Sequence, residues 1–180
     1  MGRVCPCWVT HSEILTAPGS PLAQPIDAGD GLRIGNRFAI QPMEGWDGTT
    51  DGMPTDPVRR RWRHFGISGA KLIWGGEACA VCPEGRANPN QLMCREETKG
   101  GIAELRDMLV AAHRERFGSD DGLVVGLQLT HSGRFCRPFR KDRLEPVIAY
   151  HHPILDRKFG IGPDHAPIDD GDLERLIELY

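Results

Sequence analysis

Two kinds of hydrophobic pattern alternate along residues 31–180 of this chain. Short, mainly apolar runs, such as Ala70–Trp74 and Leu123–Leu127, are separated by longer stretches whose apolar residues recur every three or four positions. Short runs of this kind are typical of buried strands, and the longer spacing predicts amphipathic helices. The pattern therefore predicts the order strand, helix, strand, helix, strand, helix.

The first half of the pattern predicts a small hairpin, a strand and a helix. Leu32–Ile34 and Phe38–Ile40 flank a Gly35-Asn36 turn signal, which predicts a hairpin leading into the first strand. Thr55-Asp56-Pro57 is a helix start, because proline is preorganised for the first turn. The expected apolar stripe of this helix consists of Val58, Trp62 and Phe65.

The second half predicts two more strands and two more helices. Ala70–Trp74 is the second expected strand, and Thr98–Phe117 is a helix ended by Gly118. Gly122–Gln128 is the third strand, followed by a long loop over Thr130–Pro167. Asp169 or Asp170 then caps a last helix, whose apolar side consists of Leu173, Leu176 and Ile177.

Strands that alternate with helices imply an α/β fold with parallel strands and crossover connections. Two architectures agree with about three β/α units: the N-terminal portion of a (β/α)8 TIM barrel, which needs ~250 residues, and a complete doubly wound domain of three strands. The chain stops at Tyr180 inside an amphipathic helix without a terminating glycine or proline, which favours a truncated barrel. Residues 1–30, with four scattered prolines, are expected to be an irregular leader that precedes a domain over 31–180.

The composition excludes several classes of protein. Hydrophobic residues make up 39% and charged residues 26%, which is typical of a globular protein with a core. The formal net charge of -3 argues against a general nucleic-acid partner, since phosphate binding needs a basic surface. No apolar run approaches the ~18 residues of a membrane span, and Met1–Gln24 lacks the apolar core of a secretory signal. We therefore expect no membrane partner.

The six cysteines show no regular disulfide framework, which predicts reduced thiols and a cytoplasmic protein. Cys5 and Cys7, and likewise Cys79 and Cys82, have a spacing compatible with a metal. A structural zinc site needs four ligands, and no second pair accompanies either one. We therefore expect no metal.

Gln128 is the most informative residue of the third expected strand. It places an amide at the end of an apolar run, directly before Thr130, His131 and Arg134. An unpaired amide inside a buried strand costs ~1–3 kcal/mol. At the carboxyl end of a parallel strand the amide can instead face a ligand; the alternative is a hydrogen bond to a neighbouring loop.

Five motifs, in the same order along the chain, resemble the Old Yellow Enzyme family of FMN-dependent NAD(P)H:flavin oxidoreductases and ene-reductases. Gln128–Arg134 resembles the family's QL-x-H-x-GR motif. The other motifs are Asn36–Met43, Asp51–Thr55, Gly69–Ile73 and Glu77–Arg86. The resemblance covers about Gly31 to Tyr180 and implies the N-terminal part of an FMN-binding TIM barrel.

The resemblance implies FMN as cofactor, NADH or NADPH as reductant, and hydride transfer through the flavin N5 atom to a small-molecule acceptor such as an activated alkene. Gln128 matches the family residue that bonds the pyrimidine edge of the flavin. Pro42, Met43 and Ala78 match residues that contact the flavin largely through their backbone. Trp46 stands where several relatives have an aromatic substrate-pocket residue, and a core role is the alternative.

Glu44 departs from the family, whose members commonly carry Thr or Cys there near the flavin O4. We expect its carboxyl group either to be protonated in the site or to turn elsewhere, because a carboxylate repels an anionic reduced flavin. His131 belongs to the motif, and a structural role is the better expectation for it.

The resemblance does not assign a catalytic residue, because the family's substrate-binding His pair follows strands beyond Tyr180. The whole protein is accordingly expected to be an FMN-dependent oxidoreductase. The alternative is that the 180 residues are a catalytically incomplete barrel fragment without activity of their own. In either case the unpaired edge of the third strand offers a surface for oligomerisation.

Overall fold

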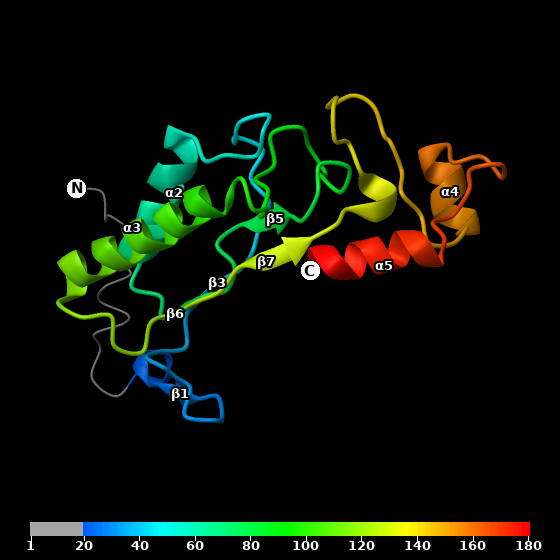
Figure 1. The fold of residues 1–180 in the computed structure, drawn as a ribbon. Coiled ribbons are helices and arrows are strands. Elements are labelled where there is room, and N and C mark those ends of the chain that lie inside the picture. Colours follow the sequence, from blue (N-terminus) through cyan, green and yellow to red (C-terminus); the bar gives the residue numbers. More distant parts are fainter. Residues whose placement is uncertain (1–19) are drawn as a thin grey trace, which may run out of the picture. The chain divides into compact units, whose positions relative to one another are not determined.

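The computed structural model describes residues 20–180, and Figure 1 shows the ribbon. Most of the expected leader, with Cys5 and Cys7, lies outside the described residues. The elements are, in order, η1 (Pro21–Ala23), β1 (Ile26–Asp27), β2 (Arg33–Ile34), β3 (Ala39–Ile40), α2 (Asp56–Ile67), β4 (Leu72–Ile73), β5 (Ala78–Ala80), α3 (Lys99–Phe117), β6 (Val124–Val125), β7 (Gln128–Thr130), η2 (Gly133–Phe135), α4 (Pro153–Phe159) and α5 (Asp170–Leu179). The predicted strands and helices alternate in the order β3, α2, β4, α3, β6, but β5 and β7 follow β4 and β6 without a helix between them. The described chain forms two compact units, each built from separate segments.

The first unit contains residues up to 42, together with 59–76 and 104–127. Its sheet has the order β3-β4-β6, and both pairs are parallel. The chain passes through α2 between β3 and β4, and through α3 between β4 and β6. Parallel neighbours require such crossovers, so the α/β class with parallel strands is confirmed. Among the described residues β6 pairs only with β4, which leaves its other edge unpaired.

Asn36 joins the first two parallel strands through its buried side chain. Its amide nitrogen donates to Gly69 O at 2.8 Å, and its amide oxygen accepts from the N–H groups of Phe38 and Lys71 at 3.1 and 3.2 Å. The Asn36 side chain therefore serves these backbone groups as a hydrogen-bond partner just before β3 and β4 begin. This explains why the motifs around Asn36 and Gly69 occur together.

The predicted hairpin is wrong in its pairing. β2 pairs antiparallel with β1, in the register Ile26↔Ile34, and not with the strand that follows it. Ala39 instead pairs in parallel with Leu72. Residues Gly35–Phe38 connect β2 to β3, and within this connection the side chain of Asn36 bonds to Gly69 O and to the N–H of Phe38.

Helices α2 and α3 supply the core of the first unit. Trp62 from α2 and Leu105 and Leu109 from α3 are buried, as the apolar stripes predicted. The helices approach closely at Gly66, where a Cβ atom would lie 2.4 Å from Leu109 O. Arg59 and Glu104 form an ion pair of 3.1 Å between the same helices.

The second unit contains residues 43–58, 77–103 and 128–180. β5 and β7 form a parallel pair in which Ala78 faces Gln128 and Ala80 faces Thr130. The predicted third strand is therefore interrupted: β6 ends at Val125, and the extended chain resumes at Gln128 and continues to Thr130. Gln128 begins a strand rather than ending one.

The segment between β5 and α3 is buried along most of its length, although it contains little regular structure. Arg86 holds it in place. The guanidinium donates to Pro83 O, Thr50 O, Pro89 O and Pro138 O at 3.2, 2.8, 2.7 and 2.8 Å. Backbone carbonyls removed from water need partners, and one planar guanidinium supplies them to Pro83 and Pro89 of the segment and to Thr50 and Pro138 outside it.

The long loop predicted over 130–167 contains regular structure. It includes η2 and α4, the latter begun by His152, whose Nδ1 accepts from Leu155 N–H at 3.3 Å, and ended by Gly160 at φ 68°. A buried ion pair joins Arg134 to Asp156 of α4. Burial opposes the charge on Asp156, but hydrogen bonds from His151 and the His152 N–H, together with Arg134, lower the pKa of this carboxyl below its ordinary value.

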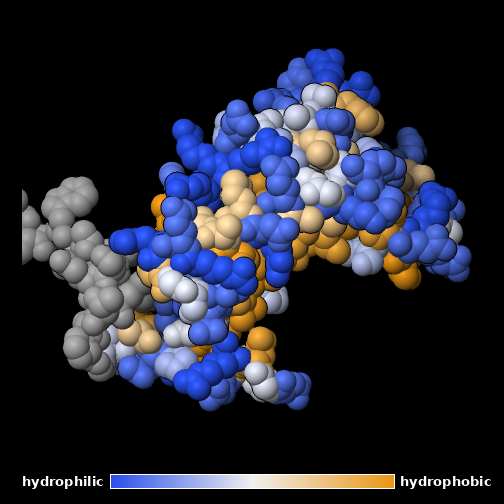
Figure 2. Space-filling model, turned by 60° about the vertical axis from the view of Figure 1, so that its left-hand side comes forward, coloured by the Kyte–Doolittle hydropathy of each residue, from blue (hydrophilic) through white to orange (hydrophobic). Residues whose placement is uncertain are grey.

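Helix α5 starts as predicted, at an Asp169 cap that forms a reciprocal capping box with Asp172. Its predicted apolar side is only partly covered by the described residues: Leu176 is half-buried, whereas Leu173 is 43% and Ile177 is 75% exposed. Figure 2 shows one face of the molecule, on which apolar patches interrupt the hydrophilic surface. No helix in the described part of the chain combines the length and the apolar character needed to cross a membrane.

Candidate functional site

The parallel pair β5–β7 brings two predicted cofactor residues together. Ala78 and Gln128 are register partners, so their side chains project from the same face of the sheet. Ala78 is buried and Gln128 is exposed. The Gln128 side chain makes no hydrogen bond to another residue within 20–180. An amide with two donors and an acceptor is therefore available to a ligand beside Ala78.

The turn Met43–Trp46 contains three further predicted site residues and is tied to the start of β5. Gly45 N–H donates to the carboxylate of Glu77, the residue before Ala78. Glu77 has no exposed surface, whereas Met43 and Trp46 are 77% and 55% exposed. The turn is thus anchored to the buried Glu77 and exposes the side chains of Met43 and Trp46 to solvent. Pro42, which precedes the turn, is half-buried in the first unit.

Glu44 has an unusual electrostatic environment. Burial raises the pKa of its carboxyl group, a hydrogen bond from the Trp46 side chain lowers it, and the charge of Glu77 raises it again. The net effect is a pKa above the ordinary value for glutamate. A raised pKa favours the neutral form, which agrees with the expectation of a protonated Glu44.

Gln91 is a residue of this region that the sequence did not reveal. Its fully buried side chain accepts from Ala87 N–H at 2.8 Å and donates to Ala78 O at 2.9 Å and Thr130 Oγ1 at 3.3 Å. It therefore fixes the backbone of β5 and joins it to the far end of β7. No local pattern distinguishes Gln91 from an ordinary polar loop residue, since its partners are distant in sequence.

His131 lies in the loop after β7 in a constrained position. Its Nδ1 accepts from Gly133 N–H at 3.1 Å, so the proton of the neutral ring is on Nε2. Burial lowers the pKa of the imidazole, and the nearby Glu84 partly opposes this effect. A Cβ atom on Gly85 would lie 2.6 Å from the ring, so glycine is required there.

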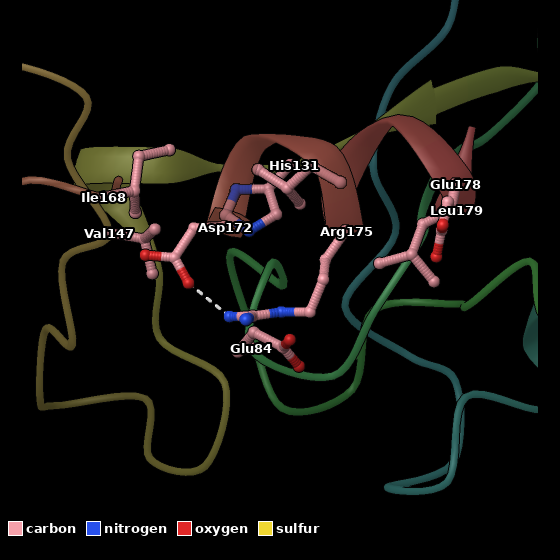
Figure 3. Close-up of a pocket in the computed structure, with 9 residues that line it drawn as sticks. Glu84, His131, Val147, Ile168, Asp172, Arg175, Glu178 and Leu179 are labelled. Atoms are coloured by element: carbon pink, nitrogen blue, oxygen red, sulfur yellow. Dashed lines mark hydrogen bonds and ion pairs between the residues drawn. The ribbon is translucent and has the colours of Figure 1, made fainter. Parts of the chain in front are cut away.

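A cavity of about 460 Å³ is lined by His131 and by residues of α5 (Figure 3). Arg175 pairs with Asp172 and reaches toward Glu84, and apolar side chains complete the wall. Its lining residues are Glu84, His131, Val147, Ile168, Asp172, Arg175, Leu176, Glu178 and Leu179. None of the predicted cofactor or substrate residues lines this cavity, so the structure does not combine it with the β5–β7 site.

The cysteines of the second unit are protonated thiols. Burial is the main cause that raises the pKa of Cys82 to about 11 and that of Cys136 to about 12. Burial and then the charge of Glu77 raise the pKa of Cys79 still further. Within residues 20–180 no three His, Cys, Asp or Glu side chains are grouped as metal ligands.

The chain was compared with known proteins by sequence and by structure. No protein-family model matches the chain. A probable N-methylproline demethylase from Rhizobium meliloti (strain 1021) is 30% identical over 166 residues, which are 91% of this chain and 22% of that protein. The chain therefore spans about a fifth of the length of this curated relative.

Similar solved structures show the same fold. A variant of morphinone reductase in complex with tetrahydroNAD matches 88% of this chain with a TM-score of 0.62 and 19% identity. The Old Yellow Enzyme homologue from Zymomonas mobilis matches 88% with a TM-score of 0.60 and 20% identity. The Old Yellow Enzyme from Trypanosoma cruzi matches 91% with a TM-score of 0.60 and 21% identity.

This chain covers 43%, 42% and 46% of those three structures, which is less than half of each. The resemblance to the Old Yellow Enzyme family that the sequence motifs carry is thus confirmed, and the chain has the α/β fold of part of these enzymes.

Proposed function

We propose that this chain is the N-terminal portion of an FMN-dependent oxidoreductase of the Old Yellow Enzyme type, with about three β/α units of a (β/α)8 barrel. The observation that carries this proposal is the pairing of Ala78 with Gln128, whose exposed amide has no partner among the described residues. The names of the similar proteins support it: two are old yellow enzymes and one is a reductase bound to a nicotinamide analogue.

The donor set fits the cofactor. The edge of an isoalloxazine ring carries both donors and acceptors, and a neutral amide can satisfy both kinds of group at once. FMN supplies hydride transfer through N5, from NADH or NADPH to an acceptor such as an activated alkene. In this proposal Gln128 binds the pyrimidine edge, while the backbone of Pro42, Met43 and Ala78 contacts the ring.

Other residues of the chain would keep these groups in place. Gln91 fixes Ala78 through its carbonyl, and Glu77 fixes the turn that carries Met43 through Gly45 N–H. Rigid supports of this kind reduce the entropy lost when a ligand binds. Trp46, which is exposed on the same turn, is the proposed contact with the substrate.

The test is flavin binding by the full-length protein that contains this chain. We expect the purified protein to show the visible absorbance of bound flavin, to release FMN on denaturation, and to be bleached by NADH or NADPH under anaerobic conditions. A well-folded protein that neither copurifies with FMN nor binds it when titrated would refute the proposal. The same titration on residues 1–180 alone tests whether this portion holds flavin by itself.

A further inference from the structure

Trp74 is an exposed aromatic residue outside the set proposed to bind the flavin. It follows β4 directly, and its backbone N–H donates to Ile40 O of β3 at 2.8 Å. Trp74 is 56% exposed, whereas Trp62 of the same unit is 1% exposed. The indole makes no hydrogen bond, ring contact or cation–π contact to another residue within 20–180. Single exposed apolar side chains are common on proteins, so the position of Trp74 in the sheet decides whether it matters.

The side chain of Trp74 projects from the face of the β3-β4-β6 sheet that α2 and α3 leave open. Successive residues of a strand project from opposite faces. Lys71 reaches His113 of α3, and Ile73 is fully buried, so these two strand positions face the helices. Leu72 and Trp74 therefore face away from them, and Leu72 is only half-buried although it lies in the middle strand.

Trp74 also stands at the carboxyl edge of this sheet. It comes directly after the last register partners, so it lies between Gln41 at the end of β3 and Gly126 at the end of β6. The ring lies beside the third strand, because its Cε3 and Cζ3 atoms would be 3.6 and 3.9 Å from a Cβ atom on Gly126. Ligands of parallel α/β sheets bind beyond this edge.

Each of the three strands leads from this edge into a residue proposed to contact the flavin. Pro42 is the second residue after β3, Ala78 is the fifth after β4, and Gln128 is the third after β6. One residue spans at most ~3.5 Å of chain, so these connections keep the three residues close to the edge that carries Trp74. The indole stands at the middle one of the three strand ends.

We propose that Trp74 is a further cofactor-binding residue, whose indole contacts the planar isoalloxazine ring of FMN. Aromatic rings pack against each other face to face with an offset or edge to face, and both rings are large and planar. The contact adds an aromatic group to a donor set that otherwise consists of the Gln128 amide and backbone atoms. The inference rests on the proposed function, because it takes FMN to be the ligand.

The first measurement is the FMN affinity of the full-length protein that contains this chain. Trp74→Leu removes the aromatic ring and should weaken FMN binding about tenfold, since stacking on an aromatic side chain is lost. Trp74→Phe keeps a ring and should retain most of the affinity. Phe139→Leu, at a site 63% exposed in the second unit, is the matched control and should change nothing. Equal FMN affinity in Trp74→Leu and in the wild type overturns the proposal.

The second measurement leaves Trp74 in place and so does not depend on the folding of a variant. Hydroxyl-radical footprinting, read by peptide mass spectrometry, is carried out with and without FMN. Without FMN, Trp74 should be oxidised and the buried Trp62 should not. FMN should reduce the oxidation of Trp74 severalfold and leave that of Phe139 unchanged. A Trp74 that resists oxidation in the FMN-free protein, or that FMN does not protect, overturns the proposal.

The two measurements separate this inference from the proposed function. If the well-folded wild type binds no FMN, the proposed function fails and the contact fails with it. If the wild type binds FMN but Trp74 is neither protected nor needed for affinity, the proposed function stands and the Trp74 contact alone is refuted. Where Trp74→Leu does not fold, as judged by circular dichroism, the footprint of the wild type decides.

Discussion

Lys71 Nζ lies 2.8 Å from His113 Nε2, and the other ring nitrogen of this fully buried histidine lies 2.8 Å from Gly66 O. A carbonyl only accepts and an ammonium only donates, so Nδ1 carries the proton and Nε2 accepts from Lys71. The imidazole is thereby fixed in its neutral form, because a proton on Nε2 would remove the acceptor and face the lysine charge.

The first prediction concerns acid stability. Burial lowers the pKa of His113, Gly66 O opposes this, Lys71 lowers it further, and Asp120 raises it. The folded pKa is thus below the unfolded value of ~6.5, so the stabilisation is complete above ~6.5 and is lost as the pH falls from there through the lower folded pKa. Urea unfolding at a series of pH values should show this loss.

The matched variants separate His113 from the other histidines. His113→Gln should be less stable at neutral pH and should reduce the slope of stability against pH. His64→Gln, at an exposed site in the last turn of α2, should leave that slope unchanged. A slope that persists in full in the His113 variant would assign the acid sensitivity to other groups.

The second prediction concerns flavin affinity. Gln128→Leu keeps the volume of the side chain but leaves the polar ring edge unpaired, at a cost of about 1–3 kcal/mol. We expect FMN to bind about tenfold to hundredfold more weakly in the full-length protein, as measured by fluorescence titration. Gln24→Leu, at an exposed position before β1, is the control. Equal affinity in the Gln128 variant and the wild type would reject the assignment of Gln128.

The third prediction concerns Arg86. Arg86→Met keeps much of the side-chain volume but leaves four backbone carbonyls without their guanidinium donor, two of them in buried hydrogen bonds, and we expect a loss of roughly 2–4 kcal/mol in the free energy of unfolding. Arg106→Met, at an exposed site, should change it by less than about 0.5 kcal/mol. Chemical denaturation of both variants tests the difference. Similar stabilities of the two variants would show that water replaces the guanidinium as the hydrogen-bond donor to these carbonyls.

The fourth prediction concerns thiol reactivity. Because the pKa of Cys82 is raised to about 11 and that of Cys136 to about 12, almost no thiolate is present at neutral pH. Iodoacetamide should therefore modify both slowly in the native protein and rapidly after denaturation, which peptide mass spectrometry can follow. Native labelling of Cys82 at the denatured rate would mean that the segment after β5 opens readily.

The fold was predictable from sequence where local patterns decide it. The apolar stripe of Val58, Trp62 and Phe65 predicted α2, and the Asp169 cap predicted α5. The alternation of helices with short apolar runs predicted that the strands are parallel. Pairing partners were less predictable. β2 pairs with β1 and not with β3, and Asn36 between β2 and β3 bonds to residues more than thirty positions away, an arrangement that leaves no local signal in the sequence.

The candidate site was predictable only in part. Resemblance identified Gln128 and Ala78, and their parallel register brings them together as neighbours. The resemblance also marked Glu44 as a departure from the residues that the family commonly carries there. It did not reveal Glu77 or Gln91 as supports, because each acts through a backbone group of a distant segment. Whether these residues hold a flavin stays a prediction.

The contacts of Arg86 also bear on the order of folding. Its guanidinium bonds to Thr50 O, 36 residues away, and to Pro138 O, 52 residues away. Closing loops of this length costs chain entropy before any of these bonds can form. We therefore expect the cluster to assemble after the rate-limiting step of folding, so that Arg86→Met speeds unfolding and leaves the folding rate nearly unchanged. Arg86 would then stabilise the folded second unit mainly by slowing its unfolding.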